Sequence, residues 1–94
     1  MEWTKTYFNI QNIKHKSDNA VCIQMPHSSA YDGYEFWHPK KLVRHGRHSY
    51  EATFSYHGGF DFELRKMGKG RYNQRDVIDS KTISADEMSA VKFV

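Results

Sequence analysis

Cysteine, proline and long apolar runs are scarce in this chain. Cys22 is the only cysteine among 94 residues, so no disulfide can form within the chain. No apolar run approaches the roughly 18 residues that a membrane-spanning helix needs, and the first residues lack the basic and apolar regions of a signal peptide. We therefore expect a cytoplasmic protein that makes no contact with a membrane.

Motifs for catalysis or metal binding are also lacking. His45 and His48 are three residues apart, but a zinc site would need further ligands, and the chain has neither a CxxC nor an HExxH motif. No GxSxG motif is present, and the Gly-Lys-Gly run at 68–70 lacks the Lys-Ser/Thr of a phosphate-binding loop. Cys22 lies in the middle of a predicted strand, where a cysteine is usually a small core residue. We expect a protein that is not an enzyme and holds no metal or cofactor.

Aromatic residues are the main material available for a core. They make up 15% of the chain, and each buries roughly 150–250 Å² when packed. We expect one domain over residues 1–94, and a domain of this size buries only about 60–65% of its unfolded surface. The predicted core residues are Trp3, Tyr7, Phe8, Phe36, Trp37, Phe54, Phe60 and Phe62.

Alternation of apolar and polar residues predicts a fold made mostly of strands. The first predicted strands cover residues 4–13, 20–25 and 34–38, and Pro39 ends the third. Residues 40–44 are predicted either to continue as extended chain or to form one helical turn.

The clearest alternation runs from Tyr50 to Tyr56 and again from Phe60 to Leu64, with two glycines at 58 and 59 between them. Glycine readily adopts the positive φ that a tight hairpin turn needs. We therefore predict a hairpin over residues 49–67. A second turn at 68–70 and a weaker strand over 72–78 follow.

A helix is predicted near the C-terminus. Ser84 and Glu87 have the spacing of a capping box, and Ile83 and Met88 occupy the positions of a hydrophobic staple. The helix would cover about residues 85–92 and would be stable only if packed on a sheet.

The expected fold class is β-rich α+β. Five or six short antiparallel strands would form either a small barrel of the SH3 or OB kind or an open, curled sheet, with one short C-terminal helix. An unpaired edge strand would also allow a homodimer.

Two segments carry basic residues without a compensating acid, and together they hold nine of the fourteen Lys and Arg residues. The first runs from His38 to His48 and the second from Arg65 to Arg75. Such segments suit an anionic partner if neighbouring turns bring them together, and the alternative is an ordinary solvated surface. The candidate binding residues are Lys40, Lys41, Arg44, Arg47, Arg65, Lys66, Lys69, Arg71 and Arg75.

The loop at residues 27–35 (HSSAYDGYE) is a second candidate contact. Tyr, Ser, Asp and Gly are the residues of protein-binding loops, because tyrosine supplies contact area at a low entropic cost. Tyr31 and Tyr34 are its candidate binding residues, and exposed tyrosines can also stack on bases. An ordinary surface loop is the alternative.

Residues 19–26 (NAVCIQMP) and 34–43 (YEFWHPKKLV) resemble a pattern in small proteins of phages and mobile elements from Gram-positive bacteria. In those proteins a hydrophobic strand precedes an aromatic-x-Pro-Lys-Lys/Ser-hydrophobic segment. Some small proteins of such elements are anti-CRISPR inhibitors, which block an RNA-guided nuclease by occupying a nucleic-acid or target-recognition surface. The resemblance implies a phage-type accessory protein, in the cytoplasm of the host cell, that binds and inhibits a host protein or protein–nucleic-acid complex.

Two functions therefore remain open at this point. One is the inhibitor that the resemblance implies, although a net charge of +3 argues against simple mimicry of DNA. The other is a small domain that binds DNA or RNA directly through the two basic segments. A direct binder should bind naked nucleic acid with an affinity that falls steeply with salt.

Overall fold

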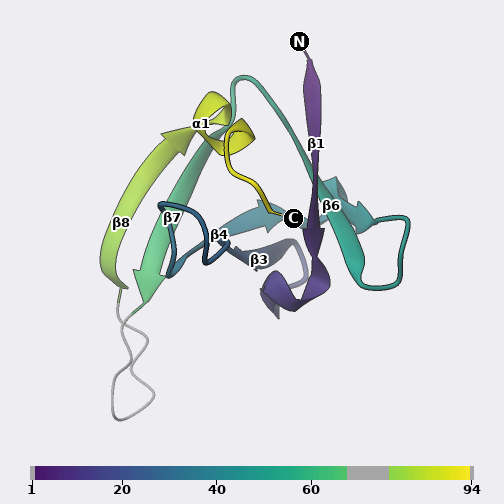
Figure 1. Cartoon of the computed structure of the whole chain (residues 1–94), viewed down its shortest axis with the longest axis horizontal. Helices are drawn as coiled ribbons and strands as arrows, with labels where there is room; N and C mark the ends of the chain where they lie inside the picture. Colours follow the sequence, from purple (N-terminus) through teal and green to yellow (C-terminus); the bar gives the residue numbers. More distant parts are fainter. Residues whose placement is uncertain (1, 68–76, 94) are drawn as a thin grey trace.

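The chain forms two antiparallel sheets with one short helix near the C-terminus (Figure 1). The computed structural model describes residues 2–67 and 77–93. Sheet A has three strands, in the order β1 (Trp3–Asn9), β6 (Glu51–His57) and β5 (Val43–His45). Sheet B has five, in the order β2 (Ile13–Lys16), β3 (Ala20–Gln24), β4 (Tyr34–Pro39), β7 (Asp61–Met67) and β8 (Val77–Ser84). The predicted fold class is confirmed, in the form of curled sheets and not of a closed barrel.

The chain passes from one sheet to the other at three corners. Two are 3₁₀ turns: η1 (Ile10–Asn12) joins β1 to β2, and η2 (Lys40–Leu42) joins β4 to β5. The third is the turn at 58–60, which joins β6 to β7. Residues 40–44 were predicted to be extended or to form a helical turn, and they combine both, because η2 leads directly into β5.

The prediction of one continuous strand over residues 4–13 is wrong, because a 3₁₀ turn interrupts it. The side chain of Asn9 accepts a hydrogen bond from the backbone N–H of Gln11, at 2.8 Å, and this starts the 3₁₀ turn η1. The extended chain therefore ends at Asn9 and resumes at Ile13 in the other sheet. Apolar alternation does not reveal such a change of direction, because both halves keep an apolar face toward the core.

The hairpin predicted over residues 49–67 is also wrong. Both strands exist, but β6 pairs with β1 and β5 in sheet A, whereas β7 pairs with β4 and β8 in sheet B. The turn between them is closed by a 3.0 Å bond from the N–H of Phe60 to the carbonyl of His57. Among the described glycines, φ is positive at Gly33 (90°) and not at Gly58 or Gly59. The two glycines thus form a corner between sheets and not a two-residue hairpin turn.

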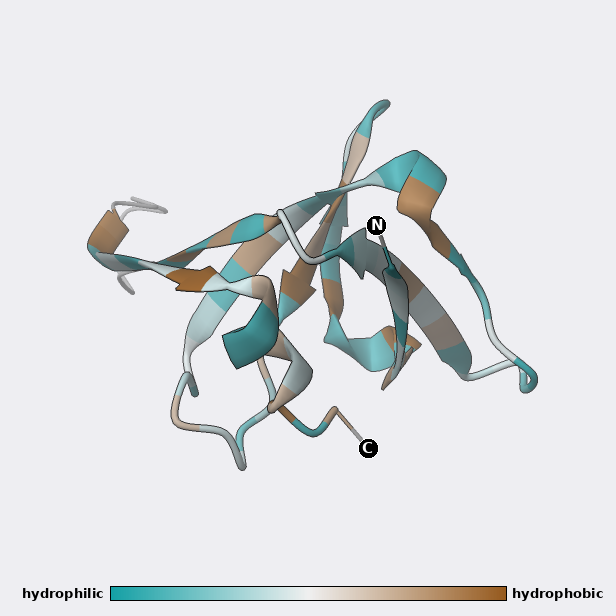
Figure 2. Ribbon diagram, turned by 90° about the horizontal axis from the view of Figure 1, so that it is seen from above, coloured by the Kyte–Doolittle hydropathy of each residue, from teal (hydrophilic) through white to brown (hydrophobic). Residues whose placement is uncertain are grey.

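A single aromatic-rich core lies between the two sheets. Each sheet contributes alternate residues to it, which Figure 2 shows as alternating hydrophobic and hydrophilic bands along the strands. Phe54 lies near its centre, with the ring of Phe36 at 5.5 Å and that of Phe93 at 5.3 Å between centroids. The buried cluster consists of Phe8, Val21, Ile23, Met25, Tyr34, Phe36, Ala52, Phe54, Tyr56, Phe62, Leu64, Ile83, Ala85, Met88 and Phe93.

The predicted core is confirmed for half of its members. Phe8, Phe36, Phe54 and Phe62 are buried, while Tyr7 and Phe60 are half-buried. The prediction is wrong for the two tryptophans, because Trp3 is 57% exposed and Trp37 is 47% exposed. Each tryptophan lies on the solvent face of its strand, opposite to the face that carries the buried phenylalanine of the same strand.

The helix α1 (Ala85–Ser89) begins where the sequence predicts and ends three residues earlier than predicted. The capping box is confirmed: the Ser84 hydroxyl accepts from the N–H of Glu87, and the Glu87 carboxylate accepts from the N–H of Ser84. Met88 is fully buried against the sheets. No helix in residues 2–67 and 77–93 has the length and apolar character to cross a membrane.

The described residues form more strands than the expected five or six because of the two 3₁₀ turns. The turn η1 divides the strand expected over residues 4–13 into β1 and β2, and η2 is followed by the separate strand β5. Strand β8 also continues to Ser84, well past the strand predicted over residues 72–78. The predicted turn at 68–70, and the first part of that weak strand, lie outside the described residues.

Candidate functional site

The solvent face of sheet A combines aromatic and basic side chains. Directly opposed residues of antiparallel strands lie on the same face, and the register places Trp3 opposite His57 and Lys5 opposite Ser55. Lys5 is exposed, and the rings of Trp3 and His57 are perpendicular to each other, with 5.2 Å between their centroids. This end of the face therefore offers an exposed indole beside an exposed ammonium group.

The next row across this face is formed by Tyr7 on β1, Thr53 on β6 and Arg44 on β5. Thr53 is buried although it lies on the solvent side, flanked by the larger Tyr7 and Arg44. The Arg44 side chain is exposed. A ring and a guanidinium group thus lie on either side of a small buried residue.

A loop between β5 and β6 adds a further cation to this face. The guanidinium carbon of Arg47 lies over the Tyr7 ring, 5.7 Å from its centre. Glu51 holds the loop in place, because its backbone carbonyl accepts from the N–H of Gly46 and its carboxylate accepts from the N–H of Arg47, both at 2.9 Å. A Cβ atom at Gly46 would come as close as 2.5 Å to the Glu51 side chain, so a larger residue at this position would displace that side chain.

A groove of about 480 Å³ opens beside Arg44, between the edge strands β2 and β5 of the two sheets. It lies where the two sheets fail to close into a barrel. Its floor is apolar and its rim is basic, and no acidic side chain lines it. The lining residues are Ile10, Ile13, Lys16, Val21, Lys40, Val43, Arg44, His45, Ser49 and Ala52.

The cations around this groove are available to a ligand. Within residues 2–67 and 77–93, the ion pairs are His27 with Asp32 and Arg65 with Glu63. The side chains of Lys16, Lys40 and Arg44 form no ion pair or hydrogen bond with the described part of the chain. We name the solvent face of sheet A (Trp3, Lys5, Tyr7, Arg44, Arg47) together with the rim of the groove (Lys16, Lys40) the basic–aromatic surface.

The first predicted basic segment contributes directly to this surface, through Lys40, Arg44 and Arg47. Lys41 lies beside it, in a shallow hollow that it shares with Asp18 and Lys40. His45 belongs to the rim of the groove, and His48 stacks on Tyr50 with 5.2 Å between ring centroids.

The second predicted basic segment is not continuous with the first in the described structure. Arg65 and Lys66 lie beside Glu35 and Tyr34, at the start of β4, whereas Lys40 follows the end of β4. Six residues of extended chain span about 20 Å, which separates the two groups. Arg65 also pairs with Glu63, at 3.1 Å. The remaining candidates, Lys69, Arg71 and Arg75, lie outside the described residues.

The two tyrosines of the loop at residues 27–35 lie next to β8. Tyr34 is buried, so its ring does not meet the condition of exposure that stacking on a base requires. Its hydroxyl donates to Asp79, which raises the pKa of Tyr34 and lowers the pKa of Asp79. The ammonium of Lys81 lies over both tyrosine rings, 4.9 Å from the centre of Tyr34 and 5.6 Å from that of Tyr31, which is half-buried. This cluster fixes β8 and the loop in place.

The titratable groups considered from the sequence as ligands or nucleophiles lie apart from the basic–aromatic surface. Cys22 is fully buried as predicted, but on the solvent side of sheet B, where its thiol donates to Glu35. His38 is buried in the core, at 2.7 Å from the carbonyl of Ser55, and burial lowers its pKa. In the part of the chain that the structure describes, no three His, Cys, Asp or Glu side chains are grouped to hold a metal ion.

Searches against protein-family models, curated proteins and solved structures found no match to this chain.

Sequence reasoning missed the contribution of β1 to the surface, because it assigned the large rings of that strand to the core. A usable signal was present. Trp3, Lys5 and Tyr7 lie at alternate positions and therefore share one face of the strand, whereas Phe8 lies on the other face. A strand with one face in solvent buries only the residues of its other face.

Proposed function

We propose that this chain binds single-stranded nucleic acid along the basic–aromatic surface. The observation that carries the proposal is the alternation of aromatic rings and cations on one face of sheet A, where Trp3 is exposed and Tyr7 is half-buried. Trp3 and Tyr7 are four residues apart on β1, which places them about 13 Å from each other. Lys5 lies between them on the same face. Rings at such a separation can each stack on a base while the cations contact the intervening phosphates.

The groove extends the same surface beyond the sheet. Arg44 belongs both to the face of sheet A and to the rim of the groove, and Lys16 and Lys40 continue the line of cations. A nucleic-acid strand that runs from Tyr7 across sheet A toward β2 would therefore meet Arg44 and then Lys16 and Lys40. Each neutralised phosphate would add to the salt dependence of binding, by about 0.7 in the logarithmic slope for a single strand.

A single strand suits this surface better than a duplex does. Stacking on Trp3 and Tyr7 requires bases that are not already stacked and paired with others. The one helix in the described residues, α1, has five residues and carries Asp86 and Glu87 in its first turn, so it does not offer a cationic helix to the major groove.

The test is fluorescence anisotropy of a labelled twelve-nucleotide oligo-dT and of a matched duplex, at 50 and 200 mM salt. We expect the single strand to bind more tightly than the duplex, with an affinity that falls as salt rises. The double variant Arg44→Ala/Arg47→Ala should weaken binding by about tenfold or more, given two lost phosphate contacts. The control Arg65→Ala/Lys92→Ala removes the same charge away from the surface and should have little effect.

Absence of binding at 50 mM salt, or equal losses in the two double variants, would overturn the proposal. In that case the phage-type inhibitor of a host protein or protein–nucleic-acid complex, which stays a prediction, would be the function to pursue. The informative experiment would then be a pull-down from host lysate with the purified protein, followed by mass spectrometry to identify a stoichiometric partner.

A further inference from the structure

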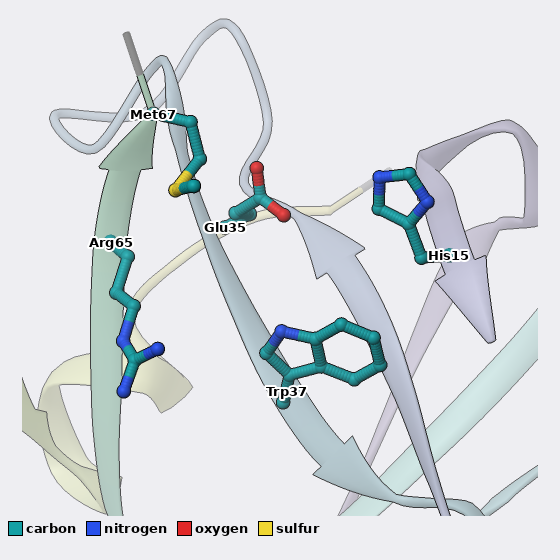
Figure 3. A pocket seen from close by; sticks show the side chains of 5 residues that line it. All are labelled: His15, Glu35, Trp37, Arg65 and Met67. Carbon is teal, nitrogen blue, oxygen red and sulfur yellow. The ribbon is translucent and has the colours of Figure 1, made fainter. Parts of the chain in front are cut away.

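The solvent face of sheet B carries a separate depression, which the proposed function does not use. Three strands line it: β2 with His15, β4 with Glu35 and Trp37, and β7 with Arg65 and Met67 (Figure 3). Its volume is about 220 Å³, below the roughly 300–1,000 Å³ of pockets that hold drug-sized ligands. The size suits one flat ring system.

A buried carboxyl group lies in this depression. Glu35 is 8% exposed, and its Oε2 atom accepts a hydrogen bond from the thiol of Cys22, which is itself fully buried. Oε1 has no hydrogen-bond partner among the described residues. Every fully buried side-chain oxygen in those residues does have a partner, so Oε1 is not fully buried. Oε1 is therefore open to the depression. A carboxylate has about four lone-pair sites, so Glu35 can accept further bonds from a ligand.

An aromatic platform lies beside this acceptor. Trp37 is 47% exposed, and Figure 3 shows its indole next to the Glu35 carboxyl group, with Met67 on one side and His15 on the other. Arg65 presents a guanidinium group at the edge of the depression. Its ion pair with Glu63 is exposed on both partners, and such pairs contribute little, so the guanidinium can exchange to an anionic ligand.

We propose that this depression binds a guanine base that carries a phosphate. Guanine has two adjacent donors on its Watson–Crick edge, N1–H and N2–H₂, which match a carboxylate acceptor, and its ring can stack on Trp37. Adenine presents an acceptor at N1, which Glu35 would repel. An alkylammonium ligand would suit Glu35 and Trp37, but the positive charge of Arg65 opposes it and favours a phosphate instead.

This inference goes beyond the proposed function, because it concerns the other sheet and a base-specific contact. The variant Trp3→Phe leaves Trp37 as the only tryptophan, so its fluorescence reports on the depression alone. We titrate this variant with GMP, IMP and AMP. IMP lacks the N2 amino group and can form one of the two hydrogen bonds to Glu35. The expected order of affinity is GMP above IMP above AMP, with about tenfold or more between GMP and AMP, as for a bidentate base contact.

Two further variants and a control complete the test, measured by calorimetry with GMP. Glu35→Gln keeps an oxygen that can accept from Cys22 but loses one acceptor, and should lower GMP affinity about tenfold or more. Trp37→Ala removes an exposed ring and should lower the GMP affinity by a similar factor. This variant keeps the inference testable if Glu35→Gln fails to fold. Tyr50→Ala removes an exposed ring that belongs neither to the depression nor to the basic–aromatic surface, and it should leave the GMP affinity unchanged.

Equal affinities for GMP and AMP, full affinity in Glu35→Gln or Trp37→Ala, or no saturable GMP binding would each overturn the inference. None of these outcomes touches the binding of oligo-dT to sheet A, since oligo-dT contains no guanine. Competition by an oligo-dT that carries one internal guanine separates the two sources of the base. Displacement of GMP assigns the site to guanine within a strand, and no displacement assigns it to a free nucleotide.

Discussion

Arg47 lies over the ring of Tyr7, with 5.7 Å between the guanidinium carbon and the ring centre. The two residues are 40 positions apart and come from β1 and from the loop before β6. An exposed cation–π pair contributes only about 0.5–1 kcal/mol. Its main consequence is that a cation and a ring are presented together on the solvent face of sheet A.

The charge of Arg47 should be visible in the salt dependence of binding. Arg47→Ala removes one phosphate contact, so the logarithmic salt slope for oligo-dT should fall in magnitude by about 0.7. Arg47→Lys keeps the charge and should keep the slope. Anisotropy titrations at four salt concentrations measure both slopes, and an unchanged slope in Arg47→Ala would place the bound strand elsewhere.

The centre of the core should be the most sensitive position for stability. Phe54 is fully buried, and the rings of Phe8, Phe36, Phe62 and Phe93 surround it. Phe54→Ala should lower the free energy of unfolding by about 3–5 kcal/mol, because it leaves a cavity between the sheets. Urea denaturation measures this loss. Trp3→Ala, at a site that is 57% exposed, is the matched control, and a similar loss there would contradict the described burial.

Acid should destabilise the fold through His38. Burial holds the pKa of His38 below the ordinary 6.5 in the folded protein, so the unfolded chain binds more protons as the pH falls below about 6.5. The free energy of unfolding should therefore decrease with falling pH in that range. His38→Gln removes this titration, and its stability should depend less on pH between 7.5 and 5 by urea denaturation. Identical pH profiles for the two proteins would exclude His38 as the cause.

The capping box should stabilise the C-terminal end of the fold. Ser84→Ala removes the hydroxyl that accepts from the N–H of Glu87, and the free energy of unfolding should decrease by about 1 kcal/mol. Ser28→Ala changes an exposed serine that caps no helix and serves as the control. Equal unfolding midpoints for Ser84→Ala and the unmodified protein would show that α1 does not depend on its cap.

The local elements of this fold were predictable because they depend on near neighbours. The cap at Ser84 is an interaction over three residues, and the strand over 20–25 is marked by its own alternation and by Pro26. Both signals lie within a few residues of the structure that they specify.

The arrangement of strands was not predictable from the same patterns. Strand β6 and strand β7 alternate as a hairpin would, yet they face each other across the core in different sheets. Alternation indicates which side of a strand is buried and does not indicate which strand lies beside it. The candidate surface shows the same limit: the basic segment around Arg44 was visible in the sequence, but its placement beside Trp3 and Tyr7 depends on the pairing of β1, β6 and β5.

The two tryptophans offer the most direct test of binding at sheet A, because Trp3 lies on the face of sheet A and Trp37 on that of sheet B. Each single-tryptophan variant, Trp37→Phe and Trp3→Phe, is titrated with oligo-dT while its fluorescence is recorded. Stacking of a base on Trp3 predicts saturable quenching in Trp37→Phe and little change in Trp3→Phe. Quenching in Trp3→Phe alone, or oligo-dT binding that leaves Trp3 unquenched, would contradict the account.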